Sequence, residues 1–350
     1  MTRARPRSAL RLAALVAALA CAVGLAAPAT AAGTPATKSG KTASAKKPTP
    51  AKKPVPSKKP VPTPPVPTTT VPTATVPTPT VAENWTGASS LFHAVSDVTR
   101  LNVVADSAAT DGQALKLQLN AHPDPGPSGG ALIAGNQLYR YGTFGSRLKT
   151  ADCTGQDHVG VVTGTFTYSR DHSDANHNGV TDNDEIDIEF LCAQPNVVYL
   201  TLWTDYSETG NNLREITRII DLRSGQVIST CFIVSYGSGC RPLLAGENSP
   251  ASVPAMPGFR SDQQYRSYWF DWQPDHVTFR ASDSAGGSVV LWDYRGPRSR
   301  IPSKPSSFMQ NVTYTKAWDP LTGPSHNQPT ADTSAYLDSS FVPAVSVPAT

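Results

Sequence analysis

Short apolar runs, separated by turn-forming residues, follow one another along the chain beyond residue 82. The runs are rich in Val, Thr, Phe, Tyr and Trp, and Gly, Pro, Asn or Asp interrupts them every few residues. Such runs are typical of β-strands, and long stretches with a helical repeat are missing. We expect strands at 114–119, 160–168, 186–191, 197–203, 268–272, 276–281 and 289–292. The pattern predicts an all-β domain over residues 82–350, a β-sandwich or jelly roll of two antiparallel sheets.

The N-terminus has a different pattern. Arg3, Arg5, Arg7 and Arg11 precede an apolar stretch at 12–27, and small residues then run to Ala32. This layout predicts a secretory signal peptide at residues 1–32, and we therefore expect a secreted, extracellular protein. An uncleaved membrane anchor and a lipoprotein signal at Cys21 are the alternatives. The apolar run continues past Cys21, which disfavours the lipoprotein signal.

Residues 33–81 form a region of low complexity. They hold thirteen of the 32 prolines and eight lysines, and they lack aromatic residues. Such a segment cannot bury a core, so we expect a disordered, extended linker. One interpretation is a plain spacer. The other is that the lysines bind anionic polymers of the cell envelope.

Charge is divided unevenly between the tail and the expected domain. Residues 1–81 contain twelve basic residues and no acidic one, although the whole chain has 30 basic and 27 acidic residues. Subtracting the twelve leaves eighteen basic residues against 27 acidic ones, a formal charge of −9 for residues 82–350. An acidic domain argues against nucleic acid as a partner. We expect a monomer.

Four cysteines remain once Cys21 is set aside with the signal. An even number in an exported chain predicts disulfides, and four cysteines allow three pairings. We favour Cys231–Cys240, which closes a short Gly-containing loop, together with Cys153–Cys192. The chain has no CxxC and no Cys/His spacing that suits zinc, so we expect the sulfur to be structural.

The segment 184–191 carries the candidate chemistry. It reads Asp-Glu-Ile-Asp-Ile-Glu-Phe-Leu. On a strand, Glu185, Asp187 and Glu189 would share one face, and the apolar residues between them would enter the core. Three carboxylates in line repel one another and are poor strand formers. The bland interpretation is a solvated acidic face, and the functional one is a catalytic site.

The spacing of the two glutamates suits a glycosidase. Their backbones would be roughly 13 Å apart, and side chains that lean together can approach the roughly 5–5.5 Å of a retaining enzyme. Crowding drives the pKa values of neighbouring carboxyls apart, so that one is ionised while the other keeps its proton. Phosphate-loop and HExxH motifs are absent from the sequence.

Further short motifs lie before and after this segment and are spread over nearly all of residues 82–350. They are Ser128-Gly129-Gly130-Ala131, Tyr141-Gly142-Thr143-Phe144 with Arg147 and Lys149, Phe166-Thr167-Tyr168, residues 268–275, Met309-Gln310-Asn311 and Tyr336-Leu337-Asp338. Together with Glu-x-Asp-x-Glu at 185–189, they resemble glycoside hydrolase family 16, whose unbulged signature the chain carries. The resemblance implies a concanavalin A-like jelly roll with a concave substrate cleft.

The resemblance also implies residue roles. Glu185 would be the nucleophile and Glu189 the general acid/base, with Asp187 assisting, in retaining endo-hydrolysis of a β-linked glucan-type polysaccharide without a required cofactor. The chain departs from the family at Gly145, where Glu is frequent, and at Thr313, where a cleft Trp is usual. We expect both departures to remove contacts with sugars. The stretch between 206 and 261 is longer than usual and could reshape the cleft rim.

Aromatic residues are the candidates for sugar binding. Trp203, Trp269 and Tyr168 could lie against pyranose faces, since aromatic rings suit the apolar face of a sugar. The alternative for each is simple burial in a β-sandwich, which we expect for Trp272.

Residues 174–185 match the spacing of a calcium-binding loop. Asp174, Asn176, Asn178, Gly179, Asp182 and Glu185 occupy the positions of ligands and of the turn glycine. The closing residue, Glu185, is the expected nucleophile, so a structural calcium site would use Asp174, Asn176, Asn178 and Asp182. The alternative is a polar turn with its tip at Asn178-Gly179.

Three functions remain open from the sequence. The first is a secreted endo-β-glucanase. The second is a cell-wall transglycosylase that uses the same active site. The third is a non-catalytic carbohydrate-binding module, which three crowded acids disfavour because binding alone does not need them.

Overall fold

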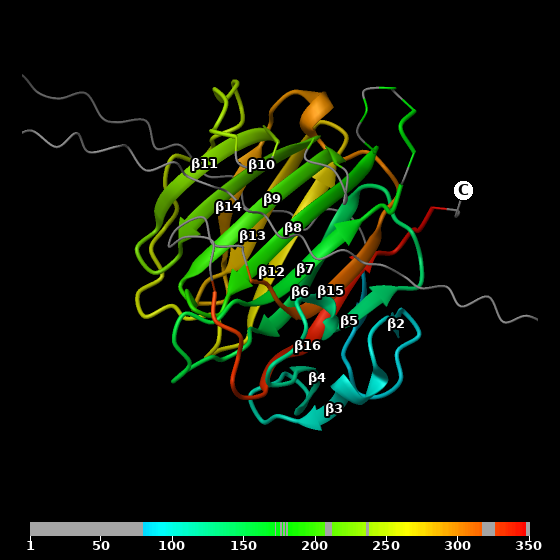
Figure 1. Cartoon of the computed structure of the whole chain (residues 1–350), viewed down its shortest axis with the longest axis vertical. Coiled ribbons are helices and arrows are strands. Elements are labelled where there is room, and N and C mark those ends of the chain that lie inside the picture. The colour runs from blue at the N-terminus through cyan, green and yellow to red at the C-terminus, as the bar shows by residue number, and fades with distance from the viewer. Residues whose placement is uncertain are drawn as a thin grey trace, which may run out of the picture. The chain divides into compact units, whose positions relative to one another are not determined.

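The structure is a computed structural model, and it describes residues 80–347 apart from 172, 176, 178, 180, 207–211, 236–237 and 317–325. Strands dominate it (Figure 1). They are β1 (Thr80–Glu83), β2 (Phe92–Ala94), β3 (Leu101–Ala105), β4 (Gln113–Leu119), β5 (Gly126–Gly135), β6 (Gly142–Lys149), β7 (Val161–Tyr168), β8 (Asn183–Leu191), β9 (Val197–Tyr206), β10 (Asn212–Asp221), β11 (Gln226–Ser235), β12 (Arg266–Gln273), β13 (His276–Ser282), β14 (Ser288–Tyr294), β15 (Ser307–Tyr314) and β16 (Thr333–Pro343). Two short 3₁₀ turns, η1 (Val98–Arg100) and η2 (Arg298–Arg300), complete the elements.

The strands form two antiparallel sheets of eight strands each, in which neighbours are often distant in sequence. Sheet A has the order β14-β13-β12-β6-β16-β4-β3, with β1 added along β16. Sheet B has the order β11-β10-β9-β8-β7-β15-β5-β2 (Figure 1). The expected all-β sandwich of two antiparallel sheets is confirmed.

A core of apolar side chains lies between the two sheets. From sheet B it takes Ile186, Ile188 and Phe190 of β8, and from sheet A it takes Phe144 of β6 and Phe270 of β12. Because successive side chains of a strand point to opposite faces, packing these residues inward fixes the register of each strand. The residues between them on β8 must then point away from the core.

The predicted strands all occur, each within two or three residues of its expected ends. The stretch between 206 and 261 contains β10 and β11, which extend sheet B at its edge and which the sequence analysis did not identify. The coil after β11 is tied back to β10 by Arg218, which is fully buried and donates a hydrogen bond to Asn248 at 2.7 Å.

The expected domain boundary needs one correction. Thr80 and Val81 were assigned to the linker, but they belong to β1 and pair with Pro343 and Val342 of β16. The expected signal peptide at 1–32 and the linker up to residue 79 lie outside the described residues. Within the described part of the chain, no helix combines the length and the apolar character needed to span a membrane.

Candidate active site

The three acids of β8 lie in the middle of sheet B. Strand β8 pairs with β7 on one side and with β9 on the other, and both registers are continuous from Glu185 to Glu189. No bulge interrupts this stretch, so Glu185, Asp187 and Glu189 project from the same face. That face is the one directed away from the core, and we call it the acid face of sheet B.

Asp187 occupies the centre of the row and is the most enclosed of the three. Its side chain is 3% exposed, whereas Glu185 and Glu189 are half-buried. The indole Nε1–H of Trp203 on β9 donates to Asp187 Oδ2 at 2.8 Å. Asp187 also shares a hydrogen bond with Glu185. The short aspartate therefore holds the first glutamate in place rather than reaching outward itself.

Burial and mutual repulsion keep protons on this row. Desolvation, followed by the charges of Glu185 and Glu189, raises the pKa of Asp187 well above its ordinary value. Desolvation is also the main cause that raises the pKa of Glu189 to about 8, and the charges of Glu185 and Glu215 add to it. At neutral pH the row can thus hold a protonated Glu189, which is the state that a proton donor needs.

Aromatic and apolar side chains surround the acids on the same face. Tyr168 on β7 and Trp203 on β9 lie directly opposite Glu185, one on each side. Both are buried, and Trp203 is only 1% exposed. They belong to an apolar cluster on the acid face that is separate from the core: Leu132, Ala134, Val162, Phe166, Tyr168, Leu191, Val197, Tyr199, Trp203, Leu213, Ile219, Ile233 and Met309.

The expectation for Trp269 is corrected by the fold. Trp269 lies on β12 of sheet A, where Tyr268 and Phe270 enter the core and Trp269 points outward. Its side chain is thus on the opposite outer face of the sandwich from the acids. Gly145 lies directly opposite Trp269 on the neighbouring strand β6 and faces the same way. The loss of a sugar contact that we expected at Gly145 is therefore also wrong.

Thr313, in contrast, lies where the expectation put it. It is on β15 opposite Val162 of β7, a member of the apolar cluster on the acid face. The acid face therefore carries a threonine at the position where we expected a cleft Trp to be missing.

A fourth carboxyl on the acid face was missed by the sequence analysis. Glu215 on β10 lies directly opposite Trp203, so Glu185, Trp203 and Glu215 form one row across three strands. It is 6% exposed, and burial raises its pKa to about 7. The only signal in the sequence was Glu215 and Thr217 flanking the apolar Ile216, which alone does not identify a strand.

The candidate calcium residues precede β8 and are only partly described. Asn176 and Asn178 lie outside the described residues. Asp174 Oδ2 accepts the backbone N–H of Gly179, and Asp182 accepts the N–H of Ala175. The ammonium of Lys304 lies 3.8 Å from Asp182. Within the described residues, no three His, Cys, Asp or Glu side chains are grouped so that they could hold a metal ion.

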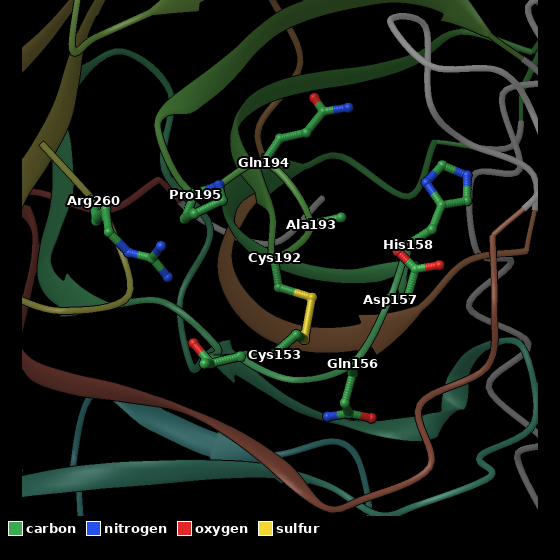
Figure 2. A pocket seen from close by; sticks show the side chains of 10 residues that line it. Cys153, Gln156, Asp157, His158, Cys192, Ala193, Gln194, Pro195 and Arg260 are labelled. Atoms are coloured by element: carbon green, nitrogen blue, oxygen red, sulfur yellow. A yellow bond between two sulfur atoms is a disulfide. The ribbon is translucent and has the colours of Figure 1, made fainter.

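A pocket of about 390 Å³ lies beyond the C-terminal end of β8 (Figure 2). Residues 192–195, which follow β8, form one wall, and Arg260 and the loop at 153–158 complete it. The acids of β8 do not line this pocket. The guanidinium of Arg260 already has a partner, because its Nε donates a hydrogen bond to Asp262 at 2.9 Å.

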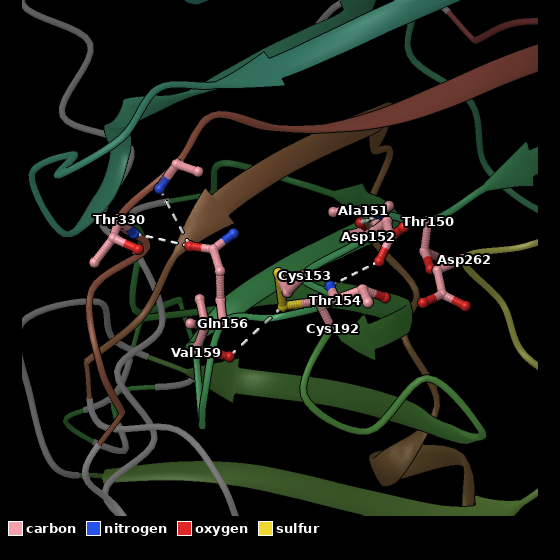
Figure 3. Close-up of a disulfide and its surroundings, with 12 residues drawn as sticks. Thr150, Ala151, Asp152, Cys153, Thr154, Gln156, Val159, Cys192, Asp262 and Thr330 are labelled. Atoms are coloured by element: carbon pink, nitrogen blue, oxygen red, sulfur yellow. Dashed lines mark hydrogen bonds between the residues drawn. A yellow bond between two sulfur atoms is a disulfide. The ribbon is translucent and has the colours of Figure 1, made fainter.

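The two disulfides join the same cysteines as we favoured. Cys153–Cys192 connects the loop after β6 to the end of β8, and Cys192 Sγ lies 3.6 Å from the carbonyl oxygen of Val159 (Figure 3). Cys231–Cys240 connects β11 to the coil that follows it. The first bond fixes the end of the acid-bearing strand.

Comparison with known proteins agrees with the motifs. Residues 96–219 match the family described as Glycosyl hydrolases family 16, a span that includes Glu185, Asp187, Glu189 and Glu215. The resemblance drawn from the sequence is confirmed over this span. A search of curated protein sequences gives no match.

Several solved structures are similar to the chain. A prokaryotic β-1,3-1,4-glucanase (lichenase) derived from a mouse hindgut metagenome has 18% identity, with 76% of this chain and 99% of that chain covered and a TM-score of 0.46. A Bacillus licheniformis β-glucanase has 18% identity, coverages of 75% and 96%, and a TM-score of 0.45. The Crh5 transglycosylase in complex with NAG has 16% identity, coverages of 75% and 83%, and a TM-score of 0.44.

Proposed function

We propose that the chain is a secreted retaining endo-glycosidase acting on a β-linked glucan-type polysaccharide, since its residues 96–219 match glycosyl hydrolases family 16. The observation that carries the proposal is the row on β8. Glu185, Asp187 and Glu189 share one face in an unbroken register, and the pKa of Glu189 is raised to about 8. One carboxylate and one carboxylic acid on a single face are what double displacement requires.

In the first step the Glu185 carboxylate attacks the anomeric carbon, and the bond to the leaving sugar oxygen breaks. Glu189 gives its proton to that oxygen, so the leaving group departs as a neutral alcohol. In the second step a water molecule gives a proton to Glu189 and attacks the anomeric carbon, which releases Glu185. Two inversions give net retention of configuration.

Asp187 assists by holding Glu185. Its hydrogen bond with Glu185 orients the nucleophile, and Trp203 fixes Asp187 from the other side. Tyr168 and Trp203 lie opposite Glu185, one on each side, and are buried, so they enclose the nucleophile.

Transglycosylation is the second candidate, since an acceptor sugar could replace water in the second step with the same residues. The match to family 16 does not by itself separate hydrolysis from transfer to an acceptor sugar. A carbohydrate-binding module without turnover is disfavoured, because the protonated Glu189 beside Glu185 serves chemistry rather than binding.

The test measures new reducing ends released by the full chain from mixed-linkage β-glucan, xyloglucan, laminarin and agarose. Glu185→Gln, which keeps the size of the side chain and removes its charge, is the matched control. Release from one polymer that is lost in the control supports the hydrolase. A change in polymer lengths without new reducing ends would indicate the transglycosylase. Binding to a polymer with neither new ends nor changed lengths would contradict the proposal that the protein is an enzyme.

The setting of the enzyme is also a proposal. The N-terminal 32 residues would direct export, and the lysines of the linker would attach the enzyme to anionic cell-envelope polymers. Replacing the eight lysines of residues 33–79 with Gln should release the protein from the envelope fraction. Unchanged fractionation would exclude this attachment.

A further inference from the structure

Glu215 is a buried carboxyl that the proposed reaction does not use. Its side chain is 6% exposed on the acid face, and Oε2 has no hydrogen-bond partner among the described residues. An unpaired carboxyl oxygen in a buried position costs free energy, because it loses its contact with water. Such a residue is expected where its charge or its proton has a use.

The hydrogen bonds of Glu215 show which way the carboxyl leans. Thr217 Oγ1 donates to Glu215 Oε1 at 2.6 Å, and Thr217 in turn lies 3.1 Å from Thr201 Oγ1 on β9. Thr217 and Thr201 belong to the row of Asp187. The carboxyl of Glu215 is thus drawn along β10, away from its own row and toward the end of the acid face that holds Glu189.

The groups around the two glutamates leave their repulsion uncompensated. On the acid face, β8 contributes Glu185 and Asp187, and β7 and β9 contribute the phenols of Tyr168 and Tyr199. On the next strand, β11, the residues paired with Glu215, Thr217 and Ile219 are Ile233, Cys231 and Ser229. At these positions, which the structure describes, no side chain is cationic. Asp221, two residues beyond Ile219 on β10, is a further anion at the Glu189 end of this face, and its carboxylate accepts the backbone N–H groups of Arg223 and Ser224.

On the premise of the proposed function, we infer that Glu215 is a positioning residue for Glu189, acting through its negative charge to keep the proton on the general acid. An anion on a buried face disfavours ionisation of a nearby carboxyl. The charge of Glu215 is one of the causes that raise the pKa of Glu189, after burial and Glu185. The same charge makes Glu189 a stronger base for the second step, in which it takes a proton from water.

The test compares pH profiles of kcat/KM for the full chain and its Glu215→Gln variant. Gln keeps the acceptor for Thr217 and removes the charge, so the alkaline limb should move to lower pH, by up to about one unit for a charge that acts across a buried face. Glu215→Asp keeps the charge and should restore most of the shift. Glu83→Gln on β1 of sheet A is the matched control and should leave the profile unchanged.

A second measurement separates this inference from the proposed function. The chain has six glutamates, so the carboxyl ¹³C signals can be titrated individually by NMR without any substrate. A lower pKa of Glu189 in Glu215→Gln supports the inference even if no polymer is cleaved. An unchanged alkaline limb together with an unchanged Glu189 titration overturns it, even if the wild type is an active glycosidase.

Discussion

The indole of Trp203 donates a hydrogen bond to Asp187 across the strand pair β8–β9, at 2.8 Å. Both side chains are almost fully buried on the acid face of sheet B. This hydrogen bond lowers the pKa of Asp187, whereas burial and the charges of Glu185 and Glu189 raise it. Trp203, for which we had considered sugar stacking, thus has a role in holding the acid row together.

Replacing Trp203 with Phe tests that role. The variant keeps an aromatic ring but loses the pyrrole part of the indole with its N–H donor, so Asp187 Oδ2 is left buried without this partner. We expect the free energy of unfolding to fall by about 1–3 kcal/mol and kcat/KM to fall roughly tenfold. Chemical denaturation and the reducing-end assay measure the two effects.

Trp269→Phe is the control for this prediction. Trp269 lies on the outer face of sheet A, so the same substitution there should leave kcat/KM unchanged. Equal losses of activity in the two variants would contradict the assignment of Trp203 to the site.

The raised pKa values predict that stability falls as pH rises. Burial is the main cause that raises the pKa of Asp184 and of Glu215 to about 7 and that of Glu189 to about 8. Below the unfolded-state values near 4 these groups are protonated in both states. Between about pH 5 and 8 the folded state binds more protons, so its stability decreases with pH and levels off above 8.

Urea denaturation at pH 5, 6, 7 and 8 measures this slope. Asp184→Asn should flatten it, because Asp184 is buried and accepts the backbone N–H groups of Ser303 and Lys304. Asp275→Asn, at an exposed carboxyl with a lowered pKa, should leave it unchanged. A stability that rises from pH 5 to 8 in the wild type would contradict the pKa directions.

The two disulfides should differ in their contribution to stability. Cys153–Cys192 spans 39 residues and Cys231–Cys240 spans 9. The entropy of loop closure predicts that replacing the first pair with Ala lowers the free energy of unfolding by about 4 kcal/mol, and the second pair by about 2.5 kcal/mol. Thermal denaturation of the two double variants gives the order, and the reverse order would show that loop length does not govern the effect.

The calcium loop stays a prediction. A bound ion would have to compete with Lys304, whose ammonium lies near both Asp182 and Asp171. The prediction is a calcium-dependent rise in Tm of the full chain that is lost in Asp174→Ala. A Tm that is the same in calcium and in EDTA would favour the polar turn.

The sequence was sufficient where alternation decides the structure. Ile186, Ile188 and Phe190 alternate with the three acids, so the register of β8 and its acid face followed from side-chain periodicity alone. It was not sufficient for β10, because Arg218 interrupts the apolar face of that strand between Ile216 and Ile220. The buried Arg218 is stabilised by a hydrogen bond to Asn248, which lies in a coil about thirty residues later in the chain.

Sheet membership was the other limit. Trp269 and Trp203 both lie in aromatic strands, and nothing local to either indicates which sheet each strand joins. That assignment depends on long-range pairing, which puts β12 beside β6 and β9 beside β8. Glu215 escaped notice for the same reason, since its relation to Glu189 arises only when β8, β9 and β10 are assembled.

The identity of the nucleophile can be read from the product of a rescued variant. Glu185→Ala, incubated with azide and the polymer that the wild type cleaves, should form a glycosyl azide, with Glu189 protonating the departing sugar. Because azide attacks from the face that Glu185 vacates, ¹H NMR should show the α-anomer from a β-linked substrate. A β-azide, or cleavage by the variant at the wild-type rate without azide, would show that Glu185 is not the nucleophile.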